Sequence, residues 1–226
     1  MAQNKSLALP YLLPFALYTG VASIPETWLG IEANYIARMV LAGGALAWAW
    51  NKIDAIRGPN SWLVSAAAGV AAGLLGTVVW VSLKLPFTGV EGTAWSDRAF
   101  WLRVAASGLL VPVFEELALR SFAMRFAFQW GRARDKKSKD AFGDALDASI
   151  HALPLGAASR FAIIVATVAF TVSHALVEWP AAIAYGLLMA ALWIWRRDLV
   201  GCIVAHATTN LSLAWFVRHQ GAWDLW

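Results

Sequence analysis

Three short polar patterns interrupt otherwise apolar segments of this sequence. They are Glu115-Glu116-x-x-x-Arg120, Phe170-x-x-x-His174 and His206-x-x-x-Asn210. A carboxylate beside an imidazole can activate water, and an amide N–H can stabilise an oxyanion. In hydrocarbon surroundings such groups are rare, and they usually face a partner, a cavity or a reaction. The three patterns therefore suit hydrolysis of an amide bond inside a membrane.

Helical spacing sorts these residues into pairs, because residues four apart on an α-helix share a face. Glu116 and Arg120 form one such pair, and we predict that they make a charge-neutral structural unit. Adjacent residues point about 100° apart, so we expect that Glu115 and Glu116 do not face the same partner. Glu115 is then the free carboxylate, with His174 and His206 as the imidazoles available within the spans. Each group alone has an ordinary structural explanation, and their co-occurrence is what indicates a site.

The composition is that of a membrane protein. Sixty per cent of the 226 residues are hydrophobic, 14% are charged, and the mean hydropathy is +0.59; a soluble domain usually carries about 25% charged residues. Apolar windows near the roughly 20 residues needed to cross a bilayer recur along the chain. We predict an all-α, polytopic transmembrane helical bundle that forms a single domain over residues 1–226. Its seven predicted spans cover residues 6–24, 34–50, 61–83, 99–121, 160–178, 180–197 and 199–218.

Two local features refine this bundle. Gly69, Gly73 and Gly76 fall in the third predicted span, where small residues let a neighbouring helix approach closely. Pro112 lies one turn before Glu115, so we expect it to kink its helix and to free a carbonyl near the site. The site itself is expected among the spans at 99–121, 160–178 and 199–218. In straight helices the two histidines of these spans would differ in depth by roughly 8 Å, so a tilt or a helix break must bring them together.

The loop charges predict an orientation. Lys and Arg are concentrated before the first span, after the second, in residues 131–159 and at Arg196 and Arg197, while the intervening loops hold few. Cytoplasmic loops carry such an excess, so the N-terminus is expected in the cytoplasm and the C-terminus outside. Residues 131–159 form a basic cytoplasmic loop with a short surface helix near 141–150. Anionic lipid headgroups account for this basic run, so the bilayer is an expected partner and nucleic acid is not.

Taken together, the three patterns resemble the motif set of the CPBP family. These are the CAAX-protease and bacteriocin-processing membrane proteases, related to the type II CAAX endopeptidase. The resemblance covers about residues 99–218, the motif-bearing catalytic core, and the first half of the chain matches only as apolar spans. It implies an intramembrane endopeptidase of the bacterial inner membrane. Its substrate would be a membrane-associated protein or peptide.

The resemblance also implies a role for each polar residue. Glu115 with His174 would activate the attacking water. His206 with Asn210 would stabilise the oxyanion, and the Glu–Arg pair would support the site. The six site residues implied are therefore Glu115, Glu116, Arg120, His174, His206 and Asn210.

Metal dependence is open at this stage. The family is commonly described as metal-dependent, and a glutamate-type mechanism without metal is the competing account. Glu115, His174 and His206 are the candidate ligands, because two imidazoles and one carboxylate can hold zinc with an open position. Asn210 suits an oxyanion better than it suits zinc, so the metal-free account is favoured and no cofactor is expected.

Two other functions fit the same residues. A non-enzymatic membrane scaffold or chaperone of this fold would use the polar pocket to bind a partner segment. A proton-coupled transporter would use Glu115 and the histidines as a relay, but the sequence lacks the pseudo-repeat halves that are common in transporters. Cleavage that Glu115→Ala abolishes would distinguish the peptidase from the scaffold.

Overall fold

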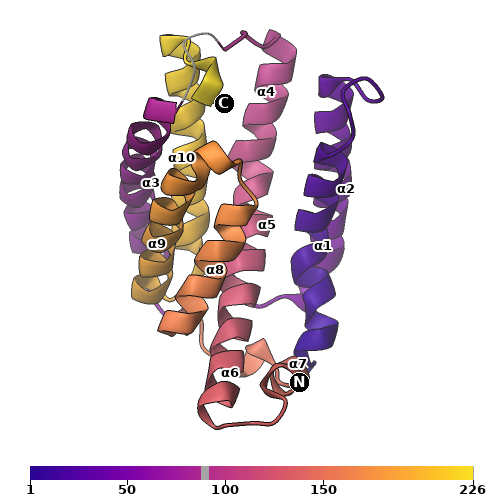
Figure 1. Cartoon of the computed structure of the whole chain (residues 1–226), viewed down its shortest axis with the longest axis vertical. Helices are drawn as coiled ribbons and strands as arrows, with labels where there is room; N and C mark the ends of the chain where they lie inside the picture. The colour runs from indigo at the N-terminus through magenta and orange to yellow at the C-terminus, as the bar shows by residue number, and fades with distance from the viewer. Residues whose placement is uncertain (88–91, 226) are drawn as a thin grey trace.

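The structure, a computed structural model, describes residues 1–87 and 92–225. These residues form helices and connecting segments, with no strand among them (Figure 1). The α-helices are α1 (Asn4–Ala22), α2 (Ile31–Ala49), α3 (Trp62–Lys84), α4 (Asp97–Ala105), α5 (Val111–Glu116), α6 (Met124–Asp135), α7 (Ala141–Asp147), α8 (Arg160–Val172), α9 (Trp179–Arg196) and α10 (Leu199–Gln220). Two π-helical segments, η3 (Ala106–Leu110) and η4 (Leu117–Ala123), join α4, α5 and α6. Residues 97–135 therefore make one continuous rod.

The helices run back and forth between two ends of an elongated bundle, and the two termini lie at opposite ends (Figure 1). Each of the seven predicted ranges contains a helix, which confirms the prediction of an all-α membrane bundle. Three helical segments, Trp62–Phe87, Leu176–Arg196 and Leu199–Gln220, are long and apolar enough to cross a bilayer on their own. Large apolar side chains such as Leu109 and Trp195 face outward, as expected for a surface that lipid covers.

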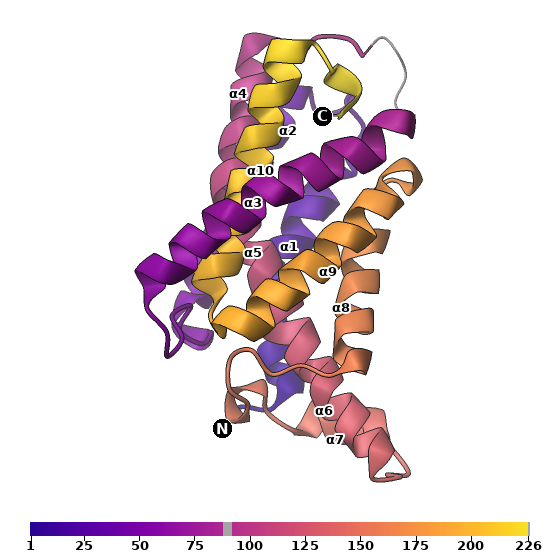
Figure 2. The same ribbon diagram turned by 90° about the vertical axis from the view of Figure 1, so that its left-hand side faces the viewer.

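The third predicted span packs its glycines against the last helix. A Cβ atom on Gly73 would lie 2.5 Å from the carbonyl oxygen of Ala205, and one on Gly69 would lie 2.6 Å from that of Gly201. Thr209 Oγ1 donates a hydrogen bond of 2.9 Å to the Gly73 carbonyl. Figure 2 shows α3 crossing α10 at a steep angle along this contact. The prediction of close helix approach is confirmed, and the contact fixes α10, which carries His206 and Asn210.

The fifth predicted span, 160–178, is too long. Helix α8 ends at Val172, and a separate 3-10 turn covers Leu176–Glu178, so His174 lies in the connection and not within a helix. The reason is local: Ser173 Oγ donates to the Phe170 carbonyl at 2.7 Å, and His174 Nδ1 lies 2.8 Å from the same oxygen. Side chains that bind backbone groups in this way compete with the helical ladder.

The rod is longer than the fourth predicted span, 99–121, because it continues as α6 into the basic segment 131–159. The expected surface helix of that segment is present as α7. Its connection folds under the N-terminus, where Asn4 Oδ1 accepts from the backbone N–H of Ile150 at 2.7 Å. The basic segment is therefore packed against the start of α1.

Candidate active site

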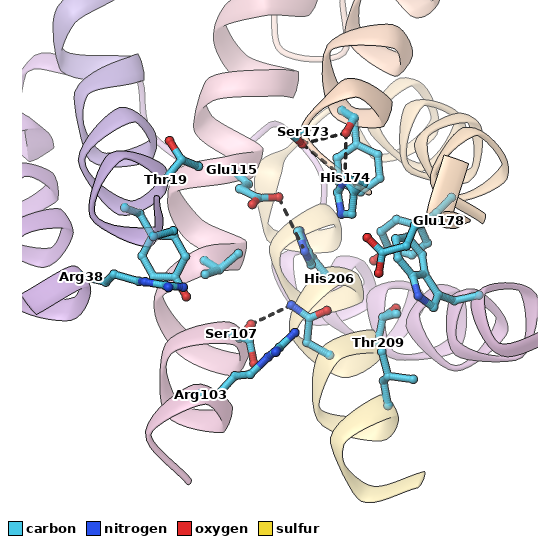
Figure 3. Close-up of a pocket in the computed structure, with 18 of the residues that line it drawn as sticks. Thr19, Arg38, Arg103, Ser107, Glu115, Ser173, His174, Glu178, His206 and Thr209 are labelled. Carbon is cyan, nitrogen blue, oxygen red and sulfur yellow. Dashed lines mark hydrogen bonds and ion pairs between the residues drawn. The ribbon is translucent and has the colours of Figure 1, made fainter. Parts of the chain in front are cut away.

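One cavity of about 460 Å³ lies between the pair α1–α2 and the helices α3, α9 and α10, with the rod along its wall. Glu115, His174 and His206 line it (Figure 3), and so does Asn210. These four residues come from the rod, the α8–α9 connection and α10. The tilt of the helices and the early end of α8 bring the two histidines to the same cavity.

His206 is held between two carboxylates. Its Nδ1 lies 2.9 Å from Glu116 Oε1, and its Nε2 lies 3.9 Å from Glu115 Oε2. The expectation that Glu115 and Glu116 do not face the same partner is therefore wrong. An imidazole presents its two nitrogens in different directions, so adjacent carboxylates on the rod can each meet one of them.

This arrangement fixes the tautomer of His206. An ionised carboxylate only accepts hydrogen bonds, so Nδ1 carries the proton that Glu116 receives. A carboxylate on one ring nitrogen orients the imidazole and favours a positive charge on it during a reaction. The other nitrogen, Nε2, is left facing Glu115 across a gap that a single oxygen atom can bridge. His206 is therefore an oriented imidazole in which Nε2 is the ring nitrogen that remains for a ligand.

Glu116 and Arg120 lie behind the cavity wall, not on it. Arg120 Nε is 3.3 Å from Glu116 Oε2, and the two side chains are 2% and 0% exposed. Arg120 also lies over the Phe170 ring at 5.5 Å and donates a long hydrogen bond of 3.5 Å to the carbonyl oxygen of Gly186. The predicted charge pair is present, and through Glu116 it connects directly to His206.

His174 is oriented by the end of its own helix. Its Nδ1 is 2.8 Å from the Phe170 carbonyl oxygen, which can only accept, so Nδ1 carries the proton and Nε2 has a free lone pair. The ring packs against Phe170 at 4.5 Å and edge-on to Trp80 at 5.3 Å. Phe170 thus does more than fill the core, because its ring and its carbonyl both position an imidazole.

Asn210 is anchored by the carbonyl that Pro112 leaves free. In the π-helical segment η3 the N–H of Val111 bonds to the carbonyl of Ala106, five residues back. Pro112 has no N–H, so the carbonyl of Ser107, five residues before it, has no backbone donor in this pattern. Asn210 Nδ2 donates to that oxygen at 2.8 Å. One hydrogen of the Asn210 amide is thereby fixed, and its second hydrogen remains for a ligand.

Residues 97–212 match the type II CAAX prenyl endopeptidase Rce1-like family. The chain belongs to this family. Among curated proteins and solved structures, no match to the chain was found.

The match to the Rce1-like family begins with α4 and ends within α10, so it contains all six residues of the three polar patterns. Helices α1, α2 and α3 lie outside it. The family is one of proteases, and the apolar helices place this member in a membrane. The Rce1-like match therefore supports an enzyme, and the identity of its working residues rests on the geometry above.

The geometry does not assemble a metal site from the three candidate ligands. Among the described residues, no three His, Cys, Asp or Glu side chains are grouped closely enough to hold a metal ion. Nδ1 of His206 and Nδ1 of His174 are engaged by Glu116 and by the Phe170 carbonyl, which leaves Nε2 of each ring for a ligand. Glu115, His174 and His206 are therefore not grouped as a metal site in this structure, and no step of the mechanism below passes through a metal.

Sequence reasoning missed several residues of the cavity. Glu178 lines it and is held by Lys84 at 2.6 Å, a pair between the end of α3 and the start of α9. The aromatic rings of Trp80 and Tyr185 pack edge-on at 6.0 Å on the same wall. Arg38, on α2, also contributes to the lining. The sequence did show an acid or a base near the end of each apolar span. Anchoring at the membrane interface explains such residues equally well, so they did not indicate a cavity.

Proposed function

We propose that the protein is an intramembrane endopeptidase that hydrolyses a peptide bond of a membrane-associated protein or peptide. The observation that carries the proposal is the cavity itself. A carboxylate, two oriented imidazoles and an anchored amide face one space of about 460 Å³, which is large enough for a short stretch of extended peptide. Membership of a protease family supports the same reaction.

In the proposed reaction Glu115 is the general base. A water between Glu115 and the two Nε2 atoms attacks the carbonyl carbon of the substrate, and its proton passes to the Glu115 carboxylate. His174 accepts a hydrogen bond from that water through its free Nε2 and so orients it. The base then returns the proton to the amine nitrogen as the C–N bond breaks, leaving a carboxylic acid and an amine.

The oxyanion that forms on the substrate carbonyl needs donors. Asn210 offers the amide hydrogen that Ser107 does not use. His206, when protonated, offers Nε2–H, and Glu116 on its other nitrogen stabilises the positive charge. A preorganised donor in a dry site contributes about 10²–10³ in rate. Arg120 acts through Glu116 as a positioning residue.

Cleavage of a membrane-tethered peptide by the purified protein, followed by mass spectrometry, tests the proposal. Glu115→Gln and His174→Ala should each lower the rate by about 10²–10⁴, as expected for loss of acid–base catalysis. The matched controls are Glu26→Gln and His219→Ala, which change an exposed glutamate and an exposed histidine outside the cavity. Both controls should cleave at the wild-type rate.

Wild-type turnover in Glu115→Gln would contradict this mechanism. Tight capture of a peptide without any product, unchanged in Glu115→Gln, would instead indicate a scaffold that retains the fold. Activity that a chelator abolishes and zinc restores would require a metal-dependent mechanism and a rearranged donor set. Metal analysis of the active preparation completes this test.

A further inference from the structure

The two ends of the bundle differ strongly in charge. The end that holds the N-terminus and α7 gathers most of the basic residues (Figure 1). They include Lys5, Lys52, Arg57, the run from Arg132 to Lys139, and the pair Arg196 and Arg197. At the opposite end bases and acids are balanced, with ion pairs such as Arg218–Asp97 at 2.6 Å and Arg98–Glu32 at 3.2 Å. The positive-inside rule assigns the basic end to the cytoplasm.

The cavity belongs entirely to the other end. It is lined by the last residue of α1 (Ala22), the first half of α2 (Arg38), the last turns of α3 (Trp80) and the α8–α9 connection (Glu178). Leu225, near the C-terminus, lines it as well. The lining includes no residue of the loops at the basic end, where the segment 131–159 packs under the N-terminus.

We propose that the cavity opens on the face of the membrane opposite the cytoplasm. The substrate class follows, and this part rests on the proposed peptidase function. The cleaved bond belongs to a membrane-anchored protein whose scissile segment has already been translocated to the outer side of the bilayer. A protein terminus that stays in the cytoplasm cannot reach Glu115 from the basic end, because the folded basic segment and the depth of the bundle separate them.

Cysteine labelling tests the direction of the opening without any turnover. Cys202 is the lone cysteine and is fully buried, so Cys202→Ala provides a cysteine-free background. Ala22→Cys then places a thiol on an exposed residue of the cavity mouth, and Ala2→Cys places the matched thiol at the basic end. A membrane-impermeant maleimide added to intact spheroplasts should label Ala22→Cys and should label Ala2→Cys only after permeabilisation.

The reverse labelling pattern would overturn the proposal and would leave the peptidase function untouched. Labelling of both thiols in intact spheroplasts would also overturn it, because both ends would then face outward in part of the population. Conversely, a protein that labels as expected and cleaves no peptide would contradict the proposed function alone.

A second, independent observation concerns Arg38. Its Nε donates to Asn34 Oδ1 at 2.5 Å, and its guanidinium lies 4.5 Å from the ring centre of Tyr35 and 5.4 Å from that of Tyr18. Among the described residues, no carboxylate lies within ion-pair distance of it. Figure 3 shows Arg38 on the side of the cavity away from His174 and Glu178.

We infer that Arg38 binds a carboxylate of the substrate, either its chain terminus or an acidic side chain near the cleaved bond. Asn34 binds Nε and Tyr18 hydrogen-bonds the guanidinium, so Arg38 is held in place while no carboxylate of the described residues neutralises its charge. The planar donors of a guanidinium match the two oxygens of a carboxylate. Arg38 would thereby set the direction in which the peptide enters, with its acidic part toward α2.

Paired peptides test this role. The wild type should cleave a peptide with a free terminal carboxylate or an acidic side chain faster than its amidated or Asn/Gln counterpart, and the two arms identify which carboxylate is read. Arg38→Gln should abolish that preference through a higher KM, and Arg38→Lys should restore part of it. Equal cleavage of all peptides by the wild type would overturn the inference, whereas no cleavage of any peptide would contradict the proposed function.

Discussion

Two polar clusters follow one another along the same rod, and each is built on a buried arginine. Nearer the basic end, Arg125 is 1% exposed, and its guanidinium makes four hydrogen bonds and one ion pair. The hydrogen-bond acceptors are Ser121 O at 2.6 Å, Ser121 Oγ at 2.6 Å, Ile150 O at 3.1 Å and Leu153 O at 3.4 Å, and the ion pair joins Nη2 to Asp54 Oδ2 at 2.6 Å. We call this set the basal cluster. It joins the rod to the loops at 50–61 and 148–159.

The cavity cluster, around Arg120, is less complete. Arg120 Nε and Nη1 have no hydrogen-bond partner among the described residues, and neither has the hydroxyl of Ser107 or the indole N–H of Trp80. Buried polar groups are normally paired, and an unpaired one costs stability. The comparison teaches that the densely bonded guanidinium of Arg125 fixes the fold, whereas the unpaired Ser107 hydroxyl and Trp80 indole, which line the cavity, are groups that a substrate can use.

The largest expected effect is on the basal cluster. Arg125→Met leaves Asp54 and several carbonyls without their donor, and breaking a buried pair of this kind costs about 3–5 kcal/mol of unfolding free energy. Thermal unfolding in detergent and limited proteolysis of the segment 131–159 measure this loss. Arg132→Met, which removes an exposed arginine from the same helix, is the control and should change little. An Arg125→Met protein as stable as the control would mean that the basal cluster is not structural.

In the cavity cluster, by contrast, we expect a substitution to lower activity strongly and stability only slightly. Asn210→Ala removes the proposed oxyanion donor, so the turnover number should fall by about 10²–10³, the usual effect of losing one such donor. The free energy of unfolding should change far less, because the Asn210 amide contributes a single hydrogen bond to the fold of the described residues, to Ser107 O. Cleavage kinetics on the tethered peptide measure the loss of turnover, and thermal unfolding measures the loss of stability. A variant with reduced stability and unimpaired turnover would place Asn210 with the structural residues.

The same contrast shows what the sequence could reveal. The stripe of Gly69 and Gly73 predicted a close helix contact, and Pro112 predicted a free carbonyl, because both effects depend on a single residue type. The end of α8 was missed because the apolar residues 175–177 continue the span beyond Ser173 and His174, while the competing bonds of these two side chains to the Phe170 carbonyl are made by local geometry.

Contacts between residues far apart in the sequence were the other feature that the sequence did not reveal. The rule that adjacent residues diverge on a helix describes Cβ directions, and it ignores the reach of a glutamate side chain and the two-sided shape of an imidazole. Glu115 and Glu116 therefore both meet His206 against expectation. The basal cluster was invisible for a related reason: Asp54 and Arg125 are far apart in the sequence, and each is individually an ordinary loop or helix-end charge.

The smallest expected effect gives the sharpest comparison, because two serines of the rod can be changed in the same way. Ser121 Oγ accepts from Arg125 at 2.6 Å, so Ser121→Ala should cost about 1.5–3 kcal/mol, as for other hydrogen bonds to charged groups. Ser107 Oγ is buried without a partner, and the backbone carbonyl that holds Asn210 survives its removal. Ser107→Ala should therefore change the free energy of unfolding by less than about 0.5 kcal/mol.

Thermal unfolding of both serine variants, measured side by side with the wild type, checks this difference. Equal losses would show that Ser107 has a partner that stabilises the fold, so that the cavity cluster is as complete as the basal one. A loss confined to Ser121→Ala, combined with reduced turnover in Ser107→Ala, would show that the Ser107 hydroxyl is one of the open groups that meet the substrate. In that case the unpaired hydroxyl is tolerated in the free protein because a ligand satisfies it during the reaction.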